Sequence, residues 1–283
     1  MTMRGRALPY LLVAPAFVFL AVLFCVPLVQ TIALAFQTGT GFGLGNFAQM
    51  ADDLNFNDAV INTFRLVGVA VPLQMLAALG MAVMLSHLRG GRNLVLWIWT
   101  IPLGLSDLAA GLVWLALLND QGYLNTVLFH LGIISGPESW LTYETPMALF
   151  AAIVIAEIWR STAIVMVVLV AGLQLVPKEY AEAASVFGAS RWQIFLRVTL
   201  PLLKPSIQSA LILRTVLAFE AFAVVLAIGG RNFPVLVSEA YNWQHFNQAP
   251  AIAAAYAVVV MAISLAATVV YLRVLRTPAA QRA

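Results

Sequence analysis

The sequence predicts an all-α, polytopic membrane protein with six transmembrane helices. Three observations point to this class: the composition, the length of the apolar runs and the placement of the basic residues. Hydrophobic residues make up 62% of the 283 residues and charged residues only 10%, whereas soluble domains hold about 45–50% and about 25%. Such a chain cannot cover a water-facing surface, so we expect the lipid bilayer to be one of its partners.

Six apolar runs are long enough to span a membrane, which takes about 20 residues. The first, residues 9–36, follows Arg4 and Arg6 as a secretory signal would. It is longer than the usual apolar run of about 7–15 residues and no small-residue cleavage site follows, so we expect it to be retained, with bends at Pro15 and Pro27. The other runs lie at residues 59–86, 94–118, 146–172, 206–228 and 250–272. The expected organisation is one transmembrane domain over residues 1–283.

The basic residues predict the orientation, because cytoplasmic loops carry an excess of Lys and Arg. With the N-terminus inside, eleven of the 15 Lys and Arg are cytoplasmic. They are Arg4, Arg6, Arg89, Arg92, Lys178, Arg191, Arg197, Lys204, Arg273, Arg276 and Arg282. The outside collects Asp52, Asp53, Asp58, Asp120, Glu138, Glu144 and Glu239. We therefore expect a multi-pass protein with both termini and the loop at residues 177–205 in the cytoplasm, and the net charge of +3 gives no indication of nucleic-acid binding.

The polar loop at residues 177–205 lies on the cytoplasmic side in this topology and is predicted to contain a short helix that ends at Gly188. Pro177 and Glu179 suit a first helical turn, and Gly188 can supply the left-handed residue at the end. Spacing of i, i+3, i+4 and i+7 defines one apolar face, which consists of Tyr180, Ala183, Ala184 and Phe187.

A second helix is predicted to begin after Gly188. Ser190 followed by Gln193 forms a capping-box pattern, and Pro201 and Pro205 interrupt the helix soon afterwards. The loop is thus expected to be a helix, a turn and a helix too short to span, which is the build of a docking element.

Six ionisable residues fall inside the predicted spans: Arg65, Asp107, Glu157, Arg160, Arg214 and Glu220. A charge at the bilayer centre costs at least about 2.5–3.5 kcal/mol, so such groups face a cavity, a partner helix or each other. Glu157 and Arg160, three residues apart on one helical face, suit a structural pair as well as a direct substrate role. Arg214 and Glu220 lie near opposite faces of one helix and are not expected to pair.

Catalytic and metal-binding residues are not expected in this chain. It contains no GxxxxGK[ST] phosphate loop, so ATP hydrolysis by that route would belong to another chain. His87, His130 and His245 are far apart and have no metal-ligand spacing.

The loop resembles a known signature. Glu182-Ala183-Ala184, Gly188 and Val198-Thr199-Leu200-Pro201 match the EAA motif of ABC importer membrane subunits. Further stretches resemble the maltose-type carbohydrate branch, among them IPLGLSDLAAGLVWLALLNDQGYLN, Ile158-Trp159-Arg160 and AGLQLVPKEY. The resemblance covers roughly residues 60–272 and implies the type I ABC importer permease fold.

The resemblance implies that the loop is a coupling helix seated in a cleft of a cytoplasmic ATPase subunit. Glu182 would be its polar anchor, Ala183 and Ala184 would allow close approach, and Gly188 would make the turn. We add the hypothesis that Tyr180 and Phe187 form the apolar contact. ATP and Mg²⁺ would bind the ATPase, and this chain would bind no cofactor. The expected partners are a second homologous permease subunit, two ATPase subunits and an external solute-binding protein.

The same resemblance implies import of a sugar, such as maltose, trehalose or another di- or oligosaccharide; a polyol or glycerol-phosphate compound is the alternative. Sugars are held by aromatic stacking plus polar side chains. The predicted pathway residues are Asp107, Trp114, Glu157, Trp159, Arg160, Phe219 and Glu220. An ion-coupled secondary transporter is the rival class, but it would show inverted repeats and paired broken helices, and the sequence gives no convincing repeat. A membrane scaffold is a further rival, but it would not need the coupling signature.

Overall fold

The computed structural model describes residues 3–39, 41–88 and 90–275. Arg89, Arg276 and Arg282, three of the basic residues that predict the orientation, lie outside the described residues. The chain forms two compact units. The first consists of the residues up to Asn57 together with Glu239–Met261, and the second consists of Asp58–Ser238 together with the residues after Met261.

The first unit begins with α1 (Met3–Leu20), a π-helical turn (Ala21–Cys25) and α2 (Val26–Phe36). A two-stranded antiparallel hairpin, β1 (Gln37–Thr38) and β2 (Gly41–Phe42), leads to α3 (Gly45–Ala51). The buried Asn46 amide donates hydrogen bonds to the carbonyl oxygens of Ala35 and Gln37, at 3.0 and 2.8 Å. These bonds satisfy carbonyl groups that the end of α2 leaves without helical partners. The unit also holds most of α13 (Leu236–His245) and the first half of α14 (Pro250–Val274).

The second unit contains the rest of α4 (Phe56–His87), followed by α5 (Arg92–Thr100), a 3-10 turn (Ile101–Gly104), α6 (Asp107–Leu118) and α7 (Tyr123–His130). Then come α8 (Pro146–Gln174), α9 (Lys178–Val186), α10 (Arg191–Ile194), a π-helical turn (Phe195–Thr199), α11 (Leu200–Phe219) and α12 (Ala223–Gly229). Helix α8 supplies buried residues to both hydrophobic clusters of this unit, one around Ile153 and Val225 and one around Met166 and Leu203.

Within the described residues, five helices are long and apolar enough to cross a membrane, and a sixth span arises if one bent pair is counted as a unit. The bent pair is Arg92–Gly104 with Asp107–His130, at 98°. The span predicted over residues 94–118 is therefore not one continuous helix. Leu105 is extended, and the Ser106 side chain accepts a hydrogen bond from the amide of Ala109, so a new helix begins there.

The prediction that the second loop helix is too short to span was wrong. Its helical backbone runs from Arg191 to Phe219 through Pro201 and Pro205. The π-helical turn Phe195–Thr199 ends two residues before Pro201. The π-helical turn Ala21–Cys25 likewise ends two residues before Pro27. Such local changes of helical register absorb the amide that proline lacks, which is how apolar spans tolerate it. At Pro15, where a bend was expected, α1 continues.

The predicted span at residues 206–228 is interrupted as well. Helix α11 ends at Phe219, and α12 begins at Ala223 after Phe222, whose backbone is neither helical nor extended. Helices α6 and α12 pack closely, because a Cβ built on Gly111 would lie 2.7 Å from the Cβ of Ala227 and 3.1 Å from the Cα of Val224. Only glycine fits at position 111 without moving a backbone.

Gly111→Ala is expected to destabilise the protein by about 1–3 kcal/mol, since the added methyl group overpacks a backbone contact. The measurement is the thermal midpoint of the purified protein in detergent. Gly80→Ala is the matched control in α4, where a built Cβ meets no described atom within 4 Å. A midpoint for Gly111→Ala equal to that of Gly80→Ala would contradict the close approach of α6 and α12.

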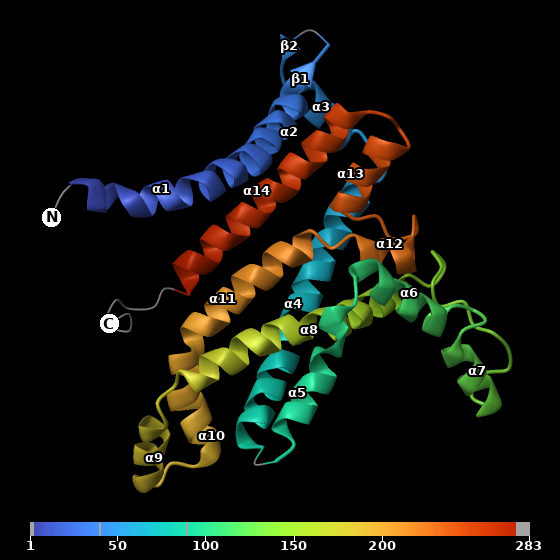
Figure 1. Ribbon diagram of the computed structural model, residues 1–283. Helices are drawn as coiled ribbons and strands as arrows, with labels where there is room; N and C mark the ends of the chain where they lie inside the picture. Colours follow the sequence, from blue (N-terminus) through green and yellow to red (C-terminus); the bar gives the residue numbers. More distant parts are fainter. Residues whose placement is uncertain (1–2, 40, 89, 276–283) are drawn as a thin grey trace. The chain divides into compact units, whose positions relative to one another are not determined.

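Figure 1 shows the turn after α4 at the same end of the second unit as α9 and α10, whereas α7 lies away from that end. The two loops that the basic residues place in the cytoplasm are thus on one side of this unit, which agrees with the predicted alternation of its spans.

Candidate functional site

The loop between α8 and α11 has the local structure that its sequence predicts. Gly188 has φ +82°, its amide donates to the carbonyl of Ser185, and the amide of Ala189 donates to the carbonyl of Ala184. This is the complete hydrogen-bond pattern of a glycine-terminated helix. Ser190 and Gln193 form the reciprocal capping box, with bonds of 2.8 and 3.3 Å. The turn between α9 and α10 is therefore fixed by hydrogen bonds among six residues between positions 184 and 193.

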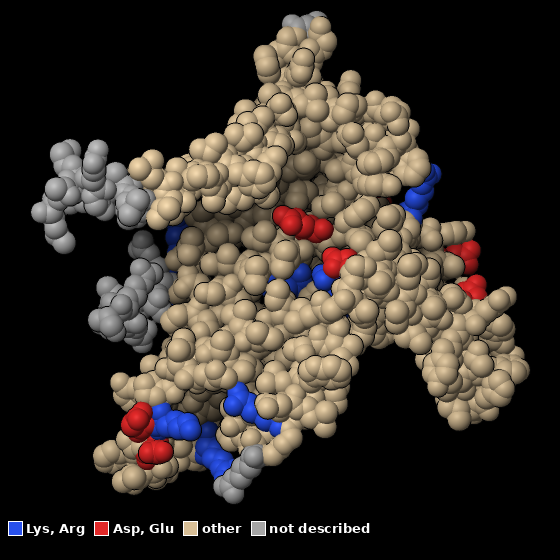
Figure 2. Space-filling view, in the orientation of Figure 1, with Lys and Arg blue, Asp and Glu red and all other residues tan. Residues whose placement is uncertain are grey.

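The predicted apolar face of α9 is uncovered. Tyr180 is 57% and Phe187 90% exposed, and Glu182 and Ala183 are also exposed. A hollow of about 430 Å³ lies in the angle between α9 and α10. It is lined by Ala184, Phe187, Gly188, Ala189, Gln193, Ile194, Arg197 and Val198. Figure 2 shows both signs of charge gathered over α9 and α10, and a second group of charged residues near the centre of the same face. This rigid, half-apolar projection has the character of a docking element.

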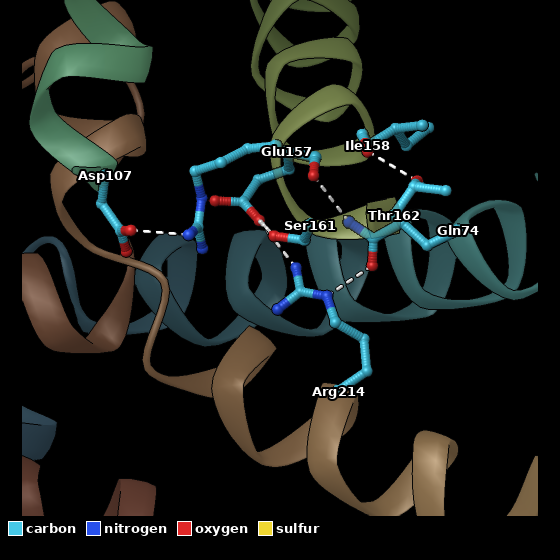
Figure 3. Close-up of polar contacts among 8 residues, drawn as sticks. Gln74, Asp107, Glu157, Ile158, Ser161, Thr162 and Arg214 are labelled. Atoms are coloured by element: carbon cyan, nitrogen blue, oxygen red, sulfur yellow. Dashed lines mark hydrogen bonds and ion pairs between the residues drawn. The ribbon is translucent and has the colours of Figure 1, made fainter. Parts of the chain in front are cut away.

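A buried ion pair joins three spans in the second unit. The guanidinium of Arg214 on α11 lies 2.6 Å from the carboxylate of Glu157 on α8, and both residues are 1% exposed. Arg214 also donates to the side-chain oxygen of Gln74 on α4, whose amide donates to the backbone carbonyl of Glu157 at 2.9 Å. Ser161 adds a hydrogen bond of 3.3 Å to the carboxylate. Figure 3 shows the whole arrangement, in which each charge is neutralised and hydrogen-bonded.

A second ion pair, between Arg160 on α8 and Asp107 on α6, is open to its surroundings. The two groups lie 2.6 Å apart, and their side chains are 20% and 50% exposed. On the same two helices, the rings of Trp114 and Trp159 meet edge to face at 6.1 Å. The Nε atoms of Arg160 and Trp114 are buried donors without a hydrogen-bond partner among the described residues. The exposed carboxylate of Asp107 and the partly exposed ring of Trp159 suit a polar ligand that brings hydroxyl groups.

Both interrupted spans place a carboxylate at the break. Asp107 is the first residue of α6, and the exposed Glu220 ends α11. The close packing of α6 on α12 brings the two interrupted segments together. The described part of the chain thus has two interrupted spans, so the presence of broken helices does not by itself distinguish this protein from a secondary transporter.

The structure divides the predicted pathway residues into two groups. Asp107, Trp114, Trp159 and Arg160 form the open cluster, and Glu220 is exposed at the break. Glu157 and Phe219 are in the packed interior, where Phe219 meets the ring of Phe64 at 5.7 Å. Glu157 and Arg160 do not pair with each other, because each has a partner on a different helix. Gln74 and Ser161 were missed; the signal for Gln74 was one amide within an otherwise apolar run.

The curated relatives of this chain are transport permeases. The sulfoquinovosyl glycerol transport system permease protein of Agrobacterium fabrum is 32% identical over 96% of this chain and 91% of the relative. The trehalose/maltose transport system permease protein of Thermococcus litoralis is 30% identical over 96% of this chain and 94% of the relative.

Two solved structures have the same fold. A chain of a bacterial ABC transporter that imports the acidic polysaccharide alginate has a TM-score of 0.81 and 24% identity, and covers 96% of this chain and 98% of its own. A chain of the alginate transporter in complex with a periplasmic protein bound to an alginate pentasaccharide has a TM-score of 0.83 and 22% identity. The match covers 96% of this chain and 95% of that chain. The fold is that of type I ABC importer permeases.

The family model described as binding-protein-dependent transport system inner membrane component matches residues 58–277, which takes in the docking loop, both ion pairs and both interrupted spans. This protein therefore belongs to the family of inner membrane components of binding-protein-dependent transport systems, as a multi-pass permease subunit.

Proposed function

We propose that this permease subunit forms half of the translocation pathway of an ATP-driven sugar importer. The observation that carries the proposal is the rigid loop at α9 and α10, with its EAA motif, its exposed apolar face and its glycine-terminated helix. A permease that moved solute by itself would not need such a projection. The energy source is therefore assigned to a partner that binds this loop.

The partner is a cytoplasmic ATPase subunit that binds ATP and Mg²⁺. The exposed rings of Tyr180 and Phe187 supply the apolar contact with it, Glu182 supplies a polar anchor, and Ala183, Ala184 and Gly188 let the two backbones approach. Because the helix that starts at Arg191 continues to Phe219, movement of the loop is carried directly into a span. We assign the loop and both chain termini to the cytoplasm, as the basic residues predict.

The complete importer contains a second homologous permease subunit, two ATPase subunits and an external solute-binding protein. Five or six spans in one chain do not enclose an aqueous path for a sugar, which supports a second permease. The description of the matched family, binding-protein-dependent transport, supports the external protein.

The transported solute is proposed to be a di- or oligosaccharide such as maltose or trehalose. The relative from Thermococcus litoralis is a trehalose/maltose permease, and the open cluster offers an exposed carboxylate and a partly exposed aromatic ring. In this proposal Asp107, Trp114, Trp159, Arg160 and Glu220 contact the sugar. Glu157 and Phe219 support the pathway from the packed interior.

Trp159→Ala is expected to reduce sugar uptake at least about tenfold while leaving assembly of the complex intact, because the ring precedes Arg160 of the open ion pair in the chain and is only partly covered. The measurement is uptake of radiolabelled trehalose or maltose by proteoliposomes. Trp97→Ala is the matched control, since Trp97 is 72% exposed on α5 and is assigned no contact with the sugar. Equal uptake by the two variants would remove Trp159 from the pathway.

A glycerol-containing solute is the second candidate, because the relative from Agrobacterium fabrum is a sulfoquinovosyl glycerol permease and Arg160 suits an anionic group. Uptake assays with a glycerol glycoside and a glycerol phosphodiester beside the disaccharides decide between the two classes. An ion-coupled secondary transporter is tested in the same vesicles. ATP-dependent uptake that persists without a proton gradient supports the importer, and gradient-driven uptake without ATP contradicts it.

A further inference from the structure

Asp53, in the turn between α3 and α4, binds two residues that are far away in the sequence. Its Oδ2 atom accepts hydrogen bonds from the indole of Trp243 at 2.6 Å and from the hydroxyl of Tyr256 at 2.9 Å. Its Oδ1 atom accepts from the amide of Asn55 at 3.1 Å. All four residues belong to the first unit. One carboxylate thus fixes the end of α13 and the start of α14 to the α3–α4 turn.

The segment that Asp53 fixes ends in an aromatic cluster, which consists of Tyr241, His245 and Phe246. The ring of His245 stacks on Tyr241 at 4.3 Å and 18°, and Phe246 meets Tyr241 edge to face at 6.1 Å. Phe246 is 62% exposed, and His245 is also exposed. Large rings held in fixed positions at a surface are the usual anchors of protein interfaces.

The backbone after the cluster is held by several local hydrogen bonds. The amides of Phe246 and Asn247 both donate to the carbonyl of Asn242, and the amide of Ala249 donates to the carbonyl of Trp243. Gln248 has φ +53° and its side chain donates to the carbonyl of His245 at 2.7 Å. A left-handed residue that is not glycine persists only where its surroundings over-determine it, and such residues gather at functional sites.

We propose that the Tyr241–His245–Phe246 cluster is a contact surface for the external solute-binding protein, and that Asp53 is the positioning residue that holds it in place. This inference rests on the proposed importer function. The predicted topology puts the α13–α14 connection outside, where the binding protein arrives. The solved alginate transporter that shares the fold is in complex with its periplasmic protein. The expected partner surface presents an apolar or basic side chain that packs on the rings.

The test uses the complete transporter in lipid nanodiscs and its purified solute-binding protein loaded with trehalose. The ATPase rate is measured against the concentration of the loaded protein. Phe246→Ala and His245→Ala are each expected to shift the half-saturating concentration upward about five- to thirtyfold, as truncation of an interface ring does, with the same plateau. Trp97→Ala removes an exposed ring from α5, which follows the turn predicted to be cytoplasmic, and is expected to leave the curve in place.

Asp53→Asn and Tyr256→Phe test the positioning role. Asp53→Asn is expected to shift the half-saturating concentration in the same direction, and the double variant with Phe246→Ala to shift it no further, because both act on one contact. Tyr256→Phe, which keeps the ring, is expected to give a smaller shift.

An unchanged half-saturating concentration in both Phe246→Ala and His245→Ala overturns the contact surface. An additive double variant, or an Asp53→Asn curve that loses only its plateau, overturns the positioning role. A wild type that no loaded binding protein stimulates overturns the importer function itself.

Discussion

Arg214→Met is expected to destabilise the protein by about 3–5 kcal/mol, because it leaves the carboxylate of Glu157 buried without a counter-charge. Glu157 would keep only the weak hydrogen bond from Ser161, and Gln74 would lose the donor on its side-chain oxygen. The measurement is the thermal midpoint of the purified permease complex, together with the amount of assembled complex in the membrane.

Two further variants separate charge from packing. Glu157→Met combined with Arg214→Met removes both charges, and it is expected to recover most of the lost stability, since replacement of a whole buried pair is often neutral. Arg65→Met removes an arginine that is exposed on α4 and is expected to change the midpoint little. If Arg214→Met melts like Arg65→Met, the buried pair does not hold these three spans together.

Gly188→Pro is expected to reduce uptake to background and to abolish stimulation of ATP hydrolysis by the binding protein, while the subunit still inserts into the membrane. Proline is held near φ −65° and has no amide hydrogen. Gly188 needs φ +82° and donates to the carbonyl of Ser185. The substitution therefore redirects α9 and its apolar face. Gly188→Asn is expected to keep most of the uptake, because asparagine tolerates the left-handed conformation.

Gly132→Pro is the matched control for Gly188→Pro. Gly132 has φ +68° and ends α7 with the same two hydrogen bonds, from Gly132 to Phe129 and from Ile133 to Leu128. The local damage is therefore alike, but α7 lies away from the end of the second unit that carries the coupling loop (Figure 1). Gly132→Pro is expected to keep ATP-driven uptake at half of the wild-type level or more. Equal loss in the two variants would show that any broken helix end abolishes transport.

The structure of the loop that contains α9 and α10 was predictable from the sequence, because it depends on residues that are close together in the chain. A glycine four residues after the EAA run and a serine three residues before a glutamine determine a helix end and a helix start. The apolar runs likewise predicted where spans occur, since their signal is local hydrophobicity.

The interruptions and the polar pairing were not predictable in the same way. The run around Leu105 and the run around Glu220 are apolar enough for unbroken helices, and the structure shows that both breaks accompany the close packing of α6 on α12 at Gly111. Glu157 and Arg160 seemed suited to each other at three residues' spacing, yet each binds a residue on another helix. Arg214 is 57 residues from Glu157 and 140 from Gln74, and a single sequence carries no signal for pairs at that distance.

The central claim is that α9 and its Gly188 turn receive the force of a cytoplasmic ATPase, and thiol cross-linking tests it most directly. Cys25 is the only cysteine of this chain, so Cys25→Ser gives a permease subunit without thiols. In that background, Phe187→Cys and Phe129→Cys are labelled, before the transporter is assembled, with a short cross-linker that carries a maleimide at one end and a photoreactive group at the other, and the assembled transporter is then illuminated. We predict an adduct between the ATPase subunit and Phe187→Cys but not Phe129→Cys. If Phe187→Cys forms no adduct and instead reacts with a membrane-impermeant maleimide added from outside, both the assigned partner and the assigned topology are contradicted.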